Sequence, residues 1–130
     1  MEKFFDEPML NKVNFINGKN AINFEFYDSS SGQDLGDITC NNIFIFNYHT
    51  NFKPNEESFP CLVFDVYTEK LTNNDEIKSI FKKLNYGYSS GYVQSDIPAI
   101  PKSDSYYYFK IVNGPVDISV VCQNVEVHKK

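Results

Sequence analysis

Histidine, cysteine and acidic side chains are the groups of this chain that could perform catalysis or hold a metal ion. The two histidines, His49 and His128, each stand near the end of a strand-like segment, with no Cys, Asp or second His at the spacing of metal ligands. No Gly-rich phosphate loop, nucleophile elbow or zinc-binding helix motif occurs in the sequence. A cysteine, a histidine and an acid could still meet in the fold, but such coincidences are expected in any chain. The sequence therefore predicts no enzyme, no metal site and no cofactor.

The three cysteines are odd in number and lie far apart. Each of them, Cys40, Cys61 and Cys122, falls inside an apolar, strand-like stretch. Buried free cysteines behave as small apolar residues, whereas disulfides and metal sites need paired or clustered thiols. We therefore expect three buried, reduced thiols.

Tyrosines and acids carry the strongest surface signal. Tyrosine offers a large rigid ring with a polar tip and is enriched at interface hot spots, and acids around it would attract a basic protein. If the long segment from residue 86 to residue 105 folds beside the strand that follows it, two groups of tyrosines come together. An equally open alternative is that these tyrosines cap the edge of the core. The candidate partner-binding residues are Tyr86, Tyr88, Tyr92, Tyr106, Tyr107 and Tyr108, with the acids Glu56, Glu57, Asp96 and Asp104.

The charge of the chain argues against binding of DNA or RNA. Seventeen acids face twelve basic residues, all of them Lys, so the formal net charge is −5. Recognition of phosphate usually exploits the Arg guanidinium, and non-specific binding of nucleic acid needs a positive field. A basic partner protein is more consistent with this balance, although mild acidity can also serve solubility alone.

A single domain of residues 1–130, built mainly from β-strands, fits the length and composition. Aromatic residues are abundant as Phe and Tyr without any Trp, which suits half-buried pleated surfaces. Asn17-Gly18 and Asn113-Gly114 each separate alternating apolar runs and predict two β-hairpins. We expect an α+β fold, mainly β: an antiparallel sheet or sandwich of about 6–8 strands with a single helix, about residues 74–85, packed on it.

The most strongly patterned stretch pairs a strand with this helix. The strand is expected at Pro60 to Tyr67, and the helix is expected to start at Asn73 or Thr72 and to stop by Gly87. Alternation in the strand and helical spacing in the helix predict one shared apolar layer. Its members would be Leu62, Phe64, Val66, Ile77, Ile80, Phe81 and Leu84.

Two segments share a pattern of an apolar residue, any residue, Cys, an amide and Asn. In the first, residues 38–45, the pair Asn41-Asn42 divides a long extended run, and a bulge or bend is expected there because Asn tolerates the left-handed conformation. The second copy covers residues 120–127. Two copies are too few for a repeat protein, so the pattern predicts a recurring bent strand or reflects chance.

The N-terminus predicts residence in the cytoplasm. Its first eight residues hold three acids, Glu2, Asp6 and Glu7, and a Pro, where a secretory signal needs an uninterrupted apolar core. The longest apolar runs are far shorter than a membrane span, so no contact with a membrane is expected either.

Three segments, taken in order, give the chain a resemblance to a known class of proteins. They are Asn42-Ile43-Phe44-Ile45-Phe46-Asn47-Tyr48, Phe59-Pro60-Cys61-Leu62-Val63-Phe64-Asp65-Val66 and Ile118-Ser119-Val120-Val121-Cys122. With them the chain resembles bacterial immunity proteins, the small acidic, aromatic-rich proteins encoded beside polymorphic toxins in contact-dependent growth inhibition and Maf-type systems. The resemblance implies a non-catalytic cytoplasmic antitoxin that binds and blocks one cognate toxin C-terminal domain, often a basic nuclease, and that is a monomer or weak homodimer when free.

Other functions remain open at this point. The main alternative is a small-molecule-binding or catalytic β domain with a pocket between sheet and helix, closed by the long loop. A third is a structural or assembly subunit.

Overall fold

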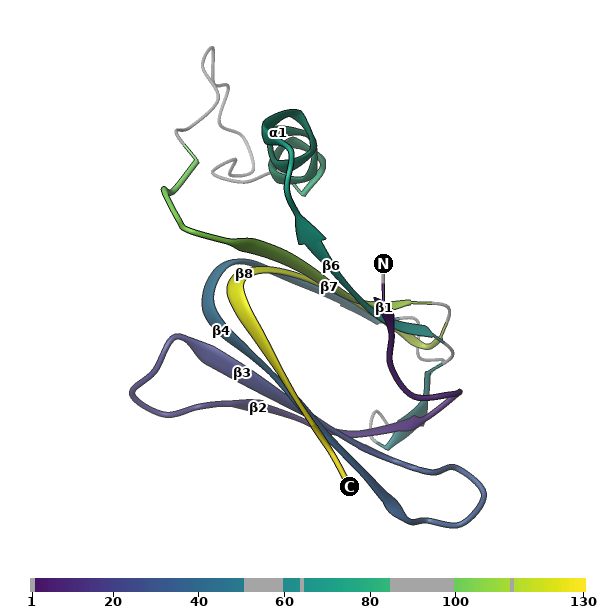
Figure 1. The fold of residues 1–130 in the computed structure, drawn as a ribbon. Helices are drawn as coiled ribbons and strands as arrows, with labels where there is room; N and C mark the ends of the chain where they lie inside the picture. The colour runs from purple at the N-terminus through teal and green to yellow at the C-terminus, as the bar shows by residue number, and fades with distance from the viewer. Residues whose placement is uncertain (1, 51–59, 64, 85–99, 113) are drawn as a thin grey trace.

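The computed structural model describes residues 2–50, 60–63, 65–84, 100–112 and 114–130. These residues form one antiparallel sheet and a helix, as expected for an α+β chain that is mainly β (Figure 1). The eight strands of the sheet follow the order β1-β6-β7-β8-β4-β3-β2-β5. The elements are β1 (Glu2–Lys3), β2 (Met9–Phe15), β3 (Ala21–Tyr27), β4 (Asp34–Thr50), β5 (Cys61–Leu62), β6 (Asp65–Leu71), α1 (Asn74–Lys83), β7 (Tyr106–Val112) and β8 (Val116–Lys129).

Both predicted hairpins are present. Strands β2 and β3 pair from Met9↔Tyr27 to Phe15↔Ile22, and Gly18 in their turn has a φ of 76°. Gly tolerates this left-handed conformation, which explains the Asn-Gly signal. In the second hairpin β7 pairs with the first half of β8.

The sheet folds over because its two longest strands bend together. Asn42 has a φ of 55°, and the pairing of β4 with β8 shifts between Ile43 and Ile45. The two segments with the shared sequence pattern are neighbours at this bend, since Asn41 pairs with Asn124 and Asn42 donates from Nδ2 to Gln123 Oε1 at 2.7 Å. The bend predicted at Asn41-Asn42 is therefore confirmed, and it divides the sheet into two layers (Figure 1).

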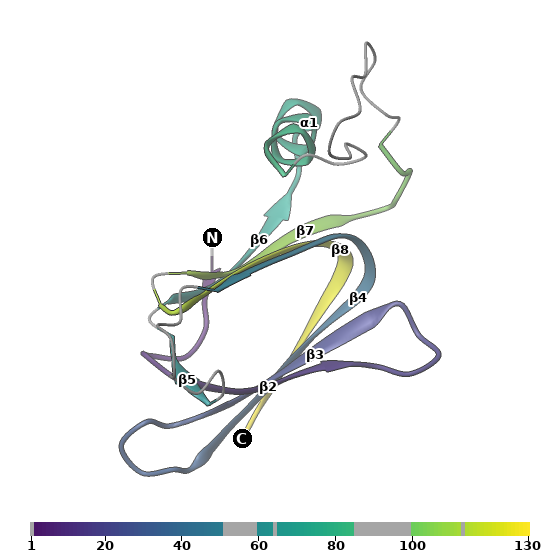
Figure 2. The ribbon, with the colours of Figure 1, turned by 180° about the vertical axis from the view of Figure 1, so that it is seen from behind.

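The layers enclose the main core. One layer holds β1, β6 and β7, the other holds β5, β2 and β3, and β4 with β8 run through both (Figure 2). Their facing side chains are buried, led by Phe24, Phe26 and Phe109. Ile22, Phe24 and Phe26 alternate with less buried residues along β3, so they share the face that points into this core.

Helix α1 packs on the outer side of the first layer (Figure 1). Asn73 is its N-cap and accepts from Asp75 N at 2.8 Å, as one of the two predicted starts requires. The helix ends at Lys83, two residues before the expected limit of 85, and Gly87 lies outside the described residues. Ile77 and Phe81 form a second core with Leu71 and residues of β4, β7 and β8.

The prediction that the strand at Pro60 to Tyr67 and the helix share one apolar layer is wrong. The stretch contains the end strand β5 and the first three residues of β6, which lie far apart in the sheet order. Val66 points into the main core, whereas Leu71 points toward the helix. The five-residue separation places them on opposite faces of a strand. Phe64 lies outside the described residues.

The three cysteines are free and buried, as predicted. A hydrogen bond with Cys122 and burial raise the pKa of the Cys40 thiol well above its ordinary value. Burial raises the pKa of Cys61 to about 11. The thiols of Cys40 and Cys61 are therefore protonated at neutral pH.

The described part of the chain holds no helix with the length and apolar character needed to cross a membrane.

Candidate functional site

Six of the predicted partner-binding residues lie outside the described residues, so their placement stays a prediction. They are Tyr86, Tyr88, Tyr92, Asp96, Glu56 and Glu57.

The four described candidates do not share one surface. Tyr108 is only 4% exposed and packs in the core beneath α1, so its assignment to a free surface is corrected. Tyr106 packs beside this core and donates its hydroxyl to Pro101 O. Tyr107 points to the opposite face, against the main core, because side chains alternate along β7. Asp104 is exposed in the segment before β7.

A row of charged residues crosses the outer face of the second layer. In the registers of β2, β3, β4 and β8, Lys12 lies opposite Glu25, Glu25 opposite Asp37, and Asp37 opposite His128. Like charges placed directly opposite on antiparallel strands are destabilising. Glu25 and Asp37 are such a pair, so the negative charge of this face lowers the stability of the sheet.

Neighbouring polar groups hold the two carboxylates in place. Asp37 Oδ1 accepts from Asn23 Nδ2 at 3.0 Å and lies 3.0 Å from His128 Nδ1. Glu25 Oε2 accepts from Asn14 Nδ2 at 3.3 Å. Both carboxylates stay partly exposed.

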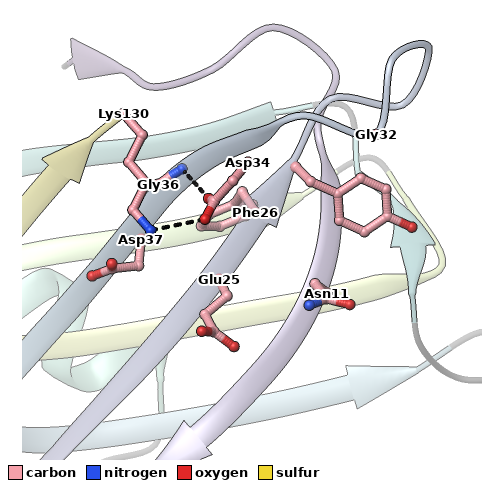
Figure 3. A pocket seen from close by; sticks show the side chains of 9 residues that line it. Asn11, Glu25, Phe26, Gly32, Asp34, Gly36, Asp37 and Lys130 are labelled. Carbon is pink, nitrogen blue, oxygen red and sulfur yellow. Dashed lines mark hydrogen bonds and ion pairs between the residues drawn. The ribbon is translucent and has the colours of Figure 1, made fainter.

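A pocket of about 290 Å³ opens beside this row, at the ends of β3 and β4 (Figure 3). Asp34 borders it and pairs with Lys130, Oδ2 to Nζ, at 2.9 Å, while Gly36 N donates to Asp34 Oδ1 at 2.8 Å. The Lys130 ammonium first, and then the Gly36 amide, hold the pKa of Asp34 below its ordinary value. The lining residues are Asn11, Glu25, Phe26, Tyr27, Gly32, Asp34, Gly36, Asp37 and Lys130.

Gly36 allows β4 to pair closely with β8 at the edge of the pocket. Its φ is 120°, and a Cβ at this position would lie 1.9 Å from the carbonyl oxygen of His128 on β8. Only Gly therefore allows β4 to approach β8 while its amide holds Asp34.

The arrangement can bind a cationic group. Three carboxylates, those of Glu25, Asp34 and Asp37, line the pocket with one ammonium, that of Lys130, so acidic side chains outnumber basic ones there by two. An Arg or Lys side chain of a partner matches this field. Within the ranges that the structure describes, no three potential metal ligands lie close enough together to hold an ion. We call this region, defined by Glu25, Asp34, Asp37 and His128, the acidic face.

Sequence reasoning placed the functional signal elsewhere. The sequence showed no partner for His128, because the contact between Asp37 and His128 joins residues 91 positions apart. In β3, Asn23 and Glu25 alternate with the buried residues Ile22, Phe24 and Phe26, and this alternation is a sign of a polar face that the sequence itself carries.

Aromatic side chains also reach the surface at positions that the sequence did not single out. Phe15 is 68% exposed and packs edge-on against Phe46, which stacks on Tyr48. Phe46 packs on the main core, so this trio continues the core to its edge.

Comparisons with known proteins place the chain in a family without assigning an activity. A family model described only as "-like" matches residues 3–129. No curated protein matches the chain. A crystal structure titled as an uncharacterized protein from Neisseria gonorrhoeae resembles the fold with a TM-score of 0.65 and 16% identity, covering 99% of this chain and 97% of that one.

Proposed function

Since the chain belongs to the family whose model spans residues 3–129, and that family's description states no activity, we propose its function from its own residues. We propose that it is an immunity protein that binds and blocks a cognate toxin domain with a basic surface. The acidic face is the observation that carries the proposal. The resemblance to immunity proteins of polymorphic toxin systems supports the same reading.

The acidic face suits binding better than catalysis. Glu25 and Asp37 stand opposite each other on rigid strands, where their charges are already fixed before a partner arrives. A preorganised acidic surface speeds encounter with a basic protein and penalises partners of the wrong charge. To block the toxin, this chain then needs only to occupy the toxin's basic groove, without catalysing a reaction.

Tyr107 and the undescribed Tyr and acid candidates would add to such an interface only if they lie on the side that the toxin contacts. Tyr108 is excluded from this role by its burial. The acidic face thus replaces the tyrosine cluster as the centre of the proposed interface.

Co-expression with the C-terminal toxin domain encoded beside this chain's gene tests the proposal. The two proteins should co-purify, and the chain should restore growth to cells that produce the toxin domain. A mismatched toxin domain from another locus serves as the specificity control. Failure of both co-purification and rescue with the neighbouring toxin would refute the proposed function.

A further inference from the structure

The second half of β8 has one edge that no described strand covers. Strand β7 pairs with β8 only as far as Tyr107↔Cys122, after which β8 bends away and continues beside β4 (Figure 1). A strand edge of this kind presents amide and carbonyl groups to which another strand can add. The edge along residues 124–129 is therefore a candidate docking surface.

The pairing of β8 with β4 shows which backbone groups face this open edge. Lys130 N donates to Leu35 O at 3.2 Å, so residue 130 points its amide group toward β4. The direction alternates along a strand, so residues 128, 126 and 124 also point their amide and carbonyl groups toward β4. The amide and carbonyl groups of Val125, Val127 and Lys129 therefore point toward the open edge, where the described part of the chain offers no strand partner.

The same three residues line a pocket of about 480 Å³ on the inner side of the edge. Val125 and Val127 are partly buried, whereas Lys129 and Glu2 are exposed, so the walls combine apolar and charged groups. Side chains of a strand alternate between its two faces, so every second side chain of a strand added to β8 would enter this pocket. The other lining residues are Phe4, Thr68 and Tyr107.

The outer side of the edge continues the acidic face. Glu126 and His128 are exposed there, and His128 lies opposite Asp37 of β4. Side chains directly opposite on neighbouring strands lie about 5 Å apart, so basic side chains of an added strand would lie beside Glu126. A second copy of this chain suits this side poorly, because each copy has a net charge of −5.

We propose that an extended segment of the basic toxin domain adds to this edge of β8 as a strand. Its main chain bonds to the outward groups of Val125 and Val127, its basic side chains lie beside Glu126, and its remaining side chains enter the pocket. This inference rests on the proposed function, because the toxin is the partner. It makes a separate claim about how the toxin binds, since a toxin could occupy the acidic face without pairing with β8.

Hydrogen exchange followed by NMR at single residues measures the edge directly. In the free chain, the amides of Val125 and Val127 should exchange at least about tenfold faster than those of Glu126 and His128, which point toward β4. Binding of the toxin domain encoded beside this chain's gene should slow exchange at Val125 and Val127 by about tenfold or more. The amides of Glu126 and His128 should be slow in both states.

Two substitutions at one position isolate the main-chain bond. Val127→Pro and Val127→Ala both remove the valine side chain, but only proline removes the outward amide donor. Val127→Pro should therefore raise Kd for the toxin domain at least about tenfold above that of Val127→Ala. Glu126→Gln removes the carboxylate on the outer side and should raise Kd about threefold.

Toxin binding without added protection at Val125 and Val127 overturns this inference and leaves the proposed function standing. Equal Kd values for Val127→Pro and Val127→Ala do the same, and an unchanged Kd for Glu126→Gln contradicts the placement of the basic side chains. Absence of binding to the wild-type chain overturns both proposals. Should Val127→Pro fail to fold, hydrogen exchange in the wild-type complex still decides the question.

Discussion

Asp37 illustrates at the scale of one residue how the acidic face is built. It faces a second acid, Glu25, across the ladder, yet Asn23 donates to it and His128 lies against it. Hydrogen-bond donors to a carboxylate reduce the cost of its charge without removing it. Two adjacent carboxylates lower the stability of the sheet, and a cationic partner would relieve their repulsion. Such a surface is therefore well suited to a cationic partner.

Gly36 is the residue whose replacement should disturb this region most. We expect Gly36→Ala to lower the free energy of unfolding by about 3 kcal/mol or more, because the φ is positive and the added Cβ meets the backbone of β8. Gly32→Ala is the matched control, since its φ is also positive, at 73°, but nothing lies within 4 Å of the added Cβ. That control should cost about 1 to 2 kcal/mol. Urea denaturation measures both, and equal losses would contradict the account of Gly36.

The raised pKa of the Cys61 thiol predicts how the stability of the protein changes at alkaline pH. Burial raises the pKa of its thiol from 9.0 to about 11 in the folded protein. The stability that this raised pKa contributes is complete below pH 9 and is lost as the pH rises toward 11, because the unfolded chain releases the proton first. The melting temperature should therefore fall between pH 9 and pH 11, and less so in Cys61→Val. Parallel pH curves for the two proteins would show that Cys61 has no such role.

Helix α1 belongs to the scaffold at the scale of elements. Phe81 is 1% exposed in the core between the helix and the sheet. Phe81→Ala should therefore cost roughly 3 to 5 kcal/mol of unfolding free energy. Lys82→Ala changes the exposed side of the same helix and should cost less than about 0.5 kcal/mol. Thermal denaturation of the two variants checks this, and an unchanged melting temperature for Phe81→Ala would contradict the packing described.

Local sequence signals predicted the elements that depend on neighbouring residues. The Asn-Gly turns gave both hairpins, Asn73 gave the start of α1, and Asn41-Asn42 gave the bend of β4. Each of these rests on the backbone preferences of a few residues. The division of Pro60 to Tyr67 between two distant parts of the sheet depends instead on pairing with distant strands, which alternation along one segment does not encode.

The whole molecule presents three distinct regions. The fold of the sheet encloses the main core, α1 covers the outside of one layer, and the outside of the other layer carries the acidic face (Figure 1). The acidic face is thus separated from the helix, and substitutions in one should affect the other only through global stability.

The acidic face could not be predicted from the sequence for the same physical reason. Residues 25, 37 and 128 become neighbours only through the register of three strands, and one shift of that register would turn them to the opposite face. Composition favours a basic partner, because the chain is acidic and lacks Arg, and this stays a prediction.

The most direct measurement of the central claim is the affinity of the purified chain for the neighbouring toxin domain, determined by calorimetry at low and high salt. The double variant Glu25→Gln with Asp37→Asn should raise Kd at least about tenfold and reduce the dependence on salt, because it removes the charges that attract the toxin. A control with the same loss of charge on the other layer, Glu69→Gln with Asp117→Asn, should change Kd less than about threefold. Equal affinities of the two double variants, or no binding by the wild-type chain, would contradict the account.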